Sequence, residues 1–129
     1  MTTVTLTADT FESVLGHNIV SVDFWASWCG PCRQFGPVFE AAADAHPDIV
    51  FGKVDTEAER ELAATVGIAS IPTLMAFRDA ILVFSLAGAL PSAGLEQVIT
   101  AVRGLDMDDV RRQVAEHATS HTDANAAAS

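Results

Sequence analysis

The two cysteines of the chain, Cys29 and Cys32, lie three positions apart and enclose Gly30 and Pro31. Sulfurs at this spacing can close a small disulfide ring where the segment turns into the start of a helix. Because so short a loop removes little entropy from the unfolded chain, the ring would stabilise a fold only weakly. Reversible two-electron chemistry is the better use of such a ring. In a reducing cytoplasm, a C-x-x-C pair is expected to be catalytic or metal-binding.

A zinc site is the main alternative for the pair. Structural zinc usually has four ligands, so further ligands would have to come from histidines. None of the histidines lies at a metal-ligand spacing from the cysteines; they are His17, His46, His117 and His121. The sequence therefore favours redox catalysis and predicts no metal.

The position of the pair at a helix start gives the two sulfurs different roles. A helix is expected from about Pro31 to His46, with Cys29 at the end of the preceding loop. The free N–H groups and the positive end of the helix dipole favour a thiolate at Cys29, which is the nucleophilic form. Cys32 should be more buried and act second. Pro31 suits a first turn, where its missing N–H costs nothing, and Gly30 lets a partner backbone approach closely.

Two charged residues belong to apolar segments that read as buried strands. Asp23 lies in the segment 19–26, six residues before Cys29, and Lys53, the only lysine, lies in the segment 49–54. Burial should raise the pKa of Asp23, and a pKa near neutral suits proton exchange with Cys32. Lys53 could reach Asp23 and tune it. A hydrogen-bonded acid without a proton role, and an edge lysine that reaches water, remain the alternatives.

A third signal is the segment Ile71-Pro72-Thr73, where proline begins a strand and removes one hydrogen-bond donor. A cis X–Pro bond costs only about 0.5–1 kcal/mol. If this bond is cis, the backbone of Ile71 stays free to pair with an extended substrate segment beside Cys29. An ordinary trans proline is the alternative.

Hydrophobic periodicity predicts alternating strands and helices that position these residues. Three strands alternate with helices and should pair in parallel, and two further strands form an antiparallel hairpin before a last amphipathic helix. Helix starts are predicted from Asp9 with Glu12 and from a capping box, Thr56 with Glu59. The result is an α/β fold with a mixed sheet of about five strands and helices on both faces. The expected strands are 4–6, 19–26, 49–54, 73–77 and 81–86.

Composition limits the function classes. At 129 residues the chain is expected to hold one domain, and its net charge of −10 argues against nucleic-acid binding. The longest apolar run, 81–90, is half of what a membrane span needs, and the first residues do not resemble a signal peptide. We therefore expect a cytoplasmic protein without a membrane or nucleic-acid partner. The expected organisation is a domain over 1–104, a short helical extension over 105–117, and a disordered, low-complexity tail over 118–129.

Taken together, the motifs resemble those of bacterial thioredoxins. Five motifs follow the thioredoxin order and spacing over roughly residues 3–103. They are the segment Asp23 to Cys32, then Pro37, Lys53-Val54-Asp55, Ile71-Pro72-Thr73 and Gly88-Ala89-Leu90. The resemblance implies a thioredoxin fold and a general protein disulfide reductase. It also implies that no cofactor is bound, that Cys29–Cys32 is a redox-active disulfide, and that an NADPH-dependent thioredoxin reductase returns it to the dithiol.

The resemblance also implies a role for each site residue. Cys29 would attack a target disulfide and Cys32 would resolve the mixed disulfide. Asp23 would transfer the proton, Lys53 would tune Asp23, and Pro72 would be cis. The resemblance also implies that the protein is a monomer and that its substrates are disulfide-containing proteins. The implied docking residues are Trp28, Gly30, Pro31, Ile71, Pro72, Ala87 and Gly88.

Two features depart from the family pattern, and other functions remain open. Ala80 stands where many thioredoxins have a hairpin glycine, and a positive φ there would cost about 1–2 kcal/mol. The chain also continues beyond Gly104. This extension motivates a rival hypothesis, a binding module in which redox turnover is incidental. An oxidant or isomerase is a third hypothesis, which the Gly30-Pro31 dipeptide disfavours by resemblance.

Overall fold

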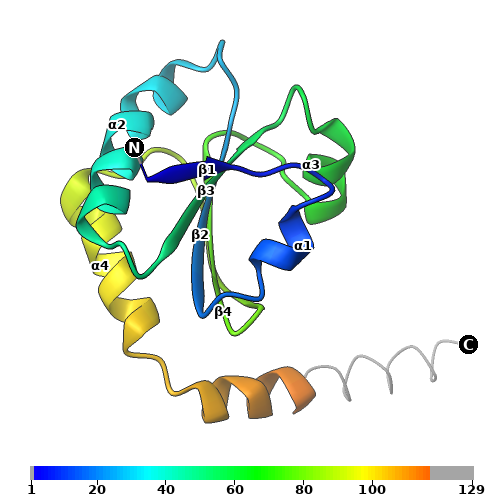
Figure 1. Cartoon of the computed structure of the whole chain (residues 1–129), viewed down its shortest axis with the longest axis vertical. Helices are drawn as coiled ribbons and strands as arrows, with labels where there is room; N and C mark the ends of the chain where they lie inside the picture. Colours follow the sequence, from blue (N-terminus) through cyan, green and yellow to red (C-terminus); the bar gives the residue numbers. More distant parts are fainter. Residues whose placement is uncertain (1, 117–129) are drawn as a thin grey trace, which may run out of the picture.

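The structure is a computed structural model, and it describes residues 2–116 (Figure 1). Five strands form one mixed sheet in the order β1-β3-β2-β4-β5. The elements in chain order are β1 (Thr3–Thr5), α1 (Phe11–Val14), β2 (Ile19–Trp25), α2 (Gly30–Ala45), β3 (Val50–Asp55), α3 (Arg60–Val66), β4 (Thr73–Arg78), β5 (Ile81–Ala87) and α4 (Ser92–Arg103).

The pairing directions agree with the alternation of elements in the sequence. β3 pairs in parallel with both β1 and β2, because a crossover helix separates each pair along the chain. β4 pairs antiparallel with β2 and with β5. β2 is therefore the central strand, flanked by β3 and β4, so its side chains are nearly all buried.

Helices cover both faces of the sheet, which confirms the predicted fold class (Figure 1). On one face, α2 and α4 bury a core that includes Phe35, Phe39, Leu95 and Ile99. On the other face, α1 and α3 cover a second core that includes Phe11 and Val22. The two apolar clusters fix the sheet between two helical layers.

A helix forms near each of the two predicted starts, but neither predicted cap is present. The cap of α1 is Thr10, whose hydroxyl accepts the Thr7 N–H at 3.0 Å, so Asp9 does not cap the helix. The helix α3 begins at Arg60, and the expected capping box of Thr56 and Glu59 does not form. Both residues of the expected box form hydrogen bonds with segments distant in sequence instead.

Long-range hydrogen bonds explain the lost capping box. The hydroxyl of Thr56 donates to the carbonyl of Trp25 at 3.0 Å and so ties the end of β3 to the end of β2. The carboxylate of Glu59 accepts the N–H of Ala8 at 2.6 Å. A capping box depends on local geometry alone, so tertiary contacts can override it.

The β4–β5 hairpin turns through Asp79 and Ala80, which have φ values of 53° and 65°. Two successive positive φ angles define a type I′ turn, whose twist matches the hairpin. Alanine in this conformation carries a steric cost that glycine avoids. The strain anticipated at Ala80 is therefore present.

Beyond α4 the chain continues as a helix over residues 107–116, drawn in orange near the β4–β5 turn in Figure 1. Met107 is buried, and Arg111 donates to Asp79 at 3.0 Å, so the helix contacts the hairpin turn. The division into a domain, an extension and a tail stays a prediction, and the predicted disorder of 118–129 lies outside the described residues. Within residues 2–116, no helix combines the length and the apolar character required to cross a membrane.

Candidate functional site

The candidate site lies at the N-terminus of α2, where the two cysteines form a disulfide. Cys29 is the N-cap residue, and its Sγ accepts the backbone N–H of Cys32 at 3.2 Å. Gly30 and Pro31 occupy the first turn, where proline breaks no helical hydrogen bond. A sulfur in this position faces the positive end of a helix of 16 residues.

Burial does not distinguish the two sulfurs. The exposed fractions of Cys29 and Cys32 are 4% and 5%, so the expectation that Cys32 is clearly more buried is wrong. The difference lies in surroundings, because the Sγ of Cys29 is 3.7 Å from the carbonyl oxygen of Ile71 and borders an open groove. The Ile71–Pro72 peptide bond is cis, as the resemblance implies.

Asp23 is fully buried in the middle of the central strand. Both carboxylate oxygens are enclosed and accept no hydrogen bond from any residue between 2 and 116. Burial raises the pKa of Asp23 to about 7, and the positive charge of Lys53 opposes this rise. The carboxyl group can therefore gain or lose a proton near neutral pH.

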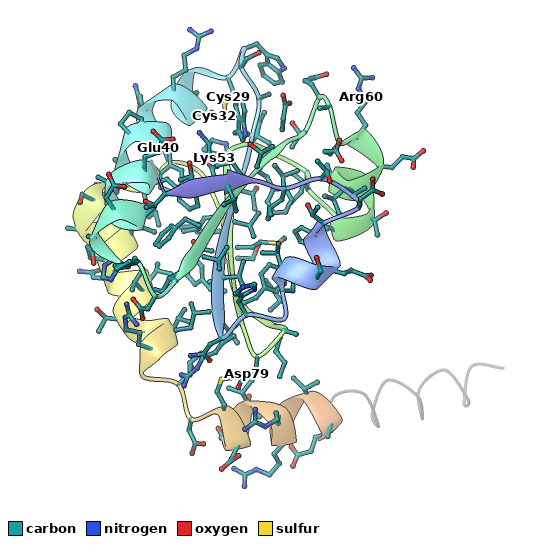
Figure 2. The ribbon with its side chains drawn as sticks, viewed as in Figure 1. Cys29, Cys32, Glu40, Lys53, Arg60 and Asp79 are labelled. Atoms are coloured by element: carbon teal, nitrogen blue, oxygen red, sulfur yellow. A yellow bond between two sulfur atoms is a disulfide. The ribbon has the colours of Figure 1, made fainter. Side chains whose placement is uncertain are left out.

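Lys53 lies on β3 directly beside Asp23 in the sheet register. In Figure 2 its label lies at the same end of the molecule as Cys29 and Cys32. Its Nζ lies over the ring of Trp25, 5.0 Å from the ring centroid. The sequence did not indicate this contact, because Trp25 belongs to a segment expected to be a buried strand, whereas the structure leaves Trp25 half-buried.

A groove of about 450 Å³ runs beside Cys29. Four of the expected docking residues line it, namely Trp28, Gly30, Pro31 and Ile71. The rest of the lining was not predicted from the sequence, because small, apolar and hydroxyl-bearing residues of this kind carry no distinctive chemical signature. These additional residues are Thr56, Ala63, Ile68, Ala69 and Ser70.

The other three expected docking residues lie next to the groove lining rather than in it. Pro72 is buried, and its carbonyl accepts the N–H of Gly88 at 2.8 Å. Ala87, the last residue of β5, pairs with Thr73. The structure therefore brings Pro72, Ala87 and Gly88 together at the end of the β4–β5 hairpin that lies nearest the cis bond.

Trp28 forms one wall of the groove and is 64% exposed. Its indole N–H donates to Glu57 Oε1 at 2.9 Å, and Glu57 also accepts from Arg60 at 2.8 Å. The hydrogen bond from Trp28, with that from Arg60, lowers the pKa of Glu57. This pair of contacts orients an otherwise exposed ring beside Cys29.

Across residues 2–116, no cluster of three or more His, Cys, Asp or Glu side chains is arranged to hold a metal. The family model named Thioredoxin matches residues 2–101. The chain belongs to the thioredoxin family. As a thioredoxin it is a thiol–disulfide oxidoreductase with protein disulfide reductase activity, and its redox-active group is the Cys29–Cys32 disulfide rather than a cofactor.

Individual relatives support the same assignment. A Streptomyces coelicolor protein that carries the name thioredoxin 2 is 59% identical over 115 residues, which is 88% of this chain and 86% of that protein. A thioredoxin from Alicyclobacillus acidocaldarius is 41% identical over 102 residues, 78% of this chain and 97% of that protein.

Solved structures give the same result for the fold. The Malassezia sympodialis thioredoxin has a TM-score of 0.70 at 36% identity, covering 77% of this chain and 89% of its own. A thioredoxin variant from Halobacterium salinarum has a TM-score of 0.73 at 30% identity, covering 80% of this chain and 91% of its own.

Proposed function

We propose that Cys29 is the attacking thiolate and Cys32 the resolving thiol of this thioredoxin. The observation that carries the proposal is the hydrogen bond from the Cys32 N–H to Cys29 Sγ, 3.2 Å long, at the N-cap of α2. An N–H donor and a helix N-terminus both stabilise negative charge on sulfur. Cys29 also borders the groove, where a target disulfide can approach.

The reaction transfers two electrons from the dithiol to the target. The Cys29 thiolate attacks one sulfur of the target disulfide, a mixed disulfide forms, and the other target sulfur leaves as a thiolate. Cys32 then attacks Cys29 Sγ as its own proton is removed. The Cys29–Cys32 bond forms, the mixed disulfide breaks, and the second target sulfur leaves as a thiolate that takes up a proton.

We assign to Asp23 the role of accepting the proton of Cys32. Its pKa of about 7 lets a substantial fraction accept a proton at neutral pH, and no hydrogen-bond donor among the described residues stabilises its charged form. Lys53 tunes this equilibrium because its charge favours the carboxylate. These assignments rest on burial and charge.

Target proteins are proposed to dock across the groove. An extended segment of the target would pair with the backbone of Ile71, whose carbonyl lies 3.7 Å from Cys29 Sγ. The proposed contact residues are Trp28, Gly30, Pro31, Ile71, Pro72, Ala87 and Gly88. An NADPH-dependent thioredoxin reductase would restore the dithiol, and we propose that the protein works as a cytoplasmic monomer.

Two single substitutions test the roles of the sulfurs. With a disulfide-containing protein and a reductase, Cys29→Ser should abolish turnover. Cys32→Ser should accumulate a covalent complex with the target, because the mixed disulfide can form but cannot be resolved. Mass spectrometry of the complex should locate the bond at Cys29. Full turnover by Cys29→Ser, or a bond at Cys32 in the wild-type protein trapped by rapid acid quenching, would contradict the assignment.

A further inference from the structure

The ammonium group of Lys53 lies against an aromatic ring although a buried carboxylate is close by. Lys53 and Asp23 are partners in the β2–β3 register, and Trp25 follows two positions later on the same face of β2. The Nζ lies 5.0 Å from the Trp25 ring centroid, whereas neither oxygen of Asp23 accepts a hydrogen bond. The cation therefore contacts the ring and acts on Asp23 only through space.

We propose that Trp25 is a positioning residue, whose ring holds the Lys53 ammonium beside Asp23 but out of direct contact with the carboxylate. This inference rests on the proposed proton role of Asp23. A direct ion pair would keep Asp23 ionised and would hinder its uptake of the proton from the Cys32 thiol. A lysine turned fully into solvent would leave the carboxyl protonated at neutral pH. The ring holds the cation between these two arrangements.

Among the aromatic side chains, tryptophan attracts a cation most strongly to the face of its ring. Trp25 sits at the end of β2, where the hydroxyl of Thr56 donates to its carbonyl and so fixes its backbone. The ring is half-buried, so the contact is partly shielded from water. These features make Trp25 a stable support for a flexible lysine side chain.

Other charged groups around Asp23 are occupied elsewhere. On β3, the carboxylate of Asp55 accepts the backbone N–H groups of Glu57 and Ala58. On α2, Glu40 accepts the hydroxyl of Thr3, and the guanidinium of Arg33 donates to the carbonyl of Ser27. On β4, the residue opposite Asp23 is Leu74. Lys53 is the charge that acts on Asp23, so its location controls the acid.

The test is a double-substitution cycle on the oxidised protein, in which the cysteines do not titrate. NMR titration of the Asp23 carboxyl carbon gives its pKa in wild type, Trp25→Leu, Lys53→Met and the double variant. Trp25→Leu frees the ammonium to reach the carboxylate, so the pKa of Asp23 should fall from about 7 by roughly one pH unit. Lys53→Met should raise it, and Trp25→Leu should then have no further effect.

Trp25→Phe is the milder variant if Trp25→Leu does not fold. It keeps an aromatic face with weaker attraction, so it should give a smaller shift in the same direction. A second readout is the position of the Lys53 side-chain resonances. In wild type the ring current should shift the Lys53 ε-CH₂ protons upfield, and Trp25→Leu should abolish that shift.

Three results would overturn the inference. The pKa of Asp23 could rise in Trp25→Leu, it could fall equally whether residue 53 is lysine or methionine, or the Lys53 resonances could lack the upfield shift. The second result would mean that water entry, not the lysine, controls the acid. None of these results affects the cysteine experiment, so failure of the positioning role and failure of the proposed catalytic function can be told apart.

Discussion

The guanidinium of Arg78 reaches from the end of β4 to the segment after α4, where its Nη1 donates to the carbonyl of Leu105 at 3.0 Å. The same nitrogen donates to the carbonyls of Val102 and Arg103 at 2.9 and 3.1 Å. The last carbonyls of a helix have no partner within it, so a cation placed there satisfies them. One side chain thus ends α4 and connects the sheet to the chain that leads into the helix 107–116.

Arg78→Met should lower the free energy of unfolding by about 2 kcal/mol. Methionine keeps the apolar stem but removes the donor that three carbonyls share, and of these the carbonyl of Val102 still accepts the N–H of Leu105 at 3.4 Å. Urea denaturation followed by far-UV circular dichroism measures the loss. Arg111→Met is the matched control, because Arg111 bonds to exposed carboxylates and surface pairs contribute little. Equal stability of Arg78→Met and wild type would show that these carbonyls are satisfied by water.

Asp23 should make the oxidised protein less stable as pH rises. Its pKa is about 7 in the folded chain and 3.8 in the unfolded reference. Between these values the folded state holds more protons than the unfolded state, so the free energy of unfolding falls as pH increases. The integrated effect is about 4 kcal/mol, complete above pH ~8.

Asp23→Asn should remove this decline, and above neutral pH the variant should be more stable than wild type. Urea denaturation at a series of pH values measures both effects. Asp9→Asn, at an exposed aspartate, is the matched control and should leave the pH profile unchanged. A parallel profile for wild type and Asp23→Asn would mean that Asp23 keeps its ordinary acidity in the fold.

The strand directions and the cysteine site could be predicted because their signals are local or strongly patterned. The segment 19–25 is mostly apolar, with Ser21 and Asp23 as its polar residues, which is typical of a buried strand. The alternation with helices indicates that β1, β2 and β3 run in the same direction. The C-x-x-C spacing places Cys29 at a helix N-terminus without any tertiary information. Both conclusions follow from chain geometry.

Features that depend on contacts between distant segments could not be predicted. Thr56 and Glu59 match a capping box, but Thr56 bonds to Trp25 and Glu59 bonds to Ala8 instead. The sequence does not indicate those partners. The contact of Lys53 with Trp25 requires the β2–β3 register, which a single sequence does not specify. The groove lining also depends on tertiary structure, since it joins residues from the start of α2, from α3 and from the loops next to them.

Ala80→Gly should stabilise the protein by about 1 kcal/mol. Ala80 has a φ of 65° in the hairpin turn, a conformation in which its Cβ is crowded and glycine is not. Part of the gain is lost because glycine makes the unfolded chain more flexible. Thermal and urea unfolding measure the change. Ala58→Gly in an exposed turn without positive φ is the control and should not stabilise. A loss of stability in Ala80→Gly would contradict the strained turn.

Glu57→Ala should weaken the binding of protein disulfides and leave the chemical step intact. Glu57 orients Trp28 through the indole N–H, and without this bond the exposed ring must be ordered again each time a target docks. We expect KM for a protein disulfide to rise about threefold, with kcat unchanged.

Steady-state kinetics with a reductase measures this effect. Fluorescence anisotropy of Trp28 reports the mobility of its ring when Trp25 is replaced by Phe in both the wild-type and the Glu57→Ala protein. Glu61→Ala removes the same charge from exposed α3 without touching Trp28, so it should leave KM unchanged. Glu57→Gln keeps an acceptor oxygen and should restore most of the wild-type KM. If Glu61→Ala raised KM as much as Glu57→Ala, the acidic charge rather than the position of Trp28 would govern docking.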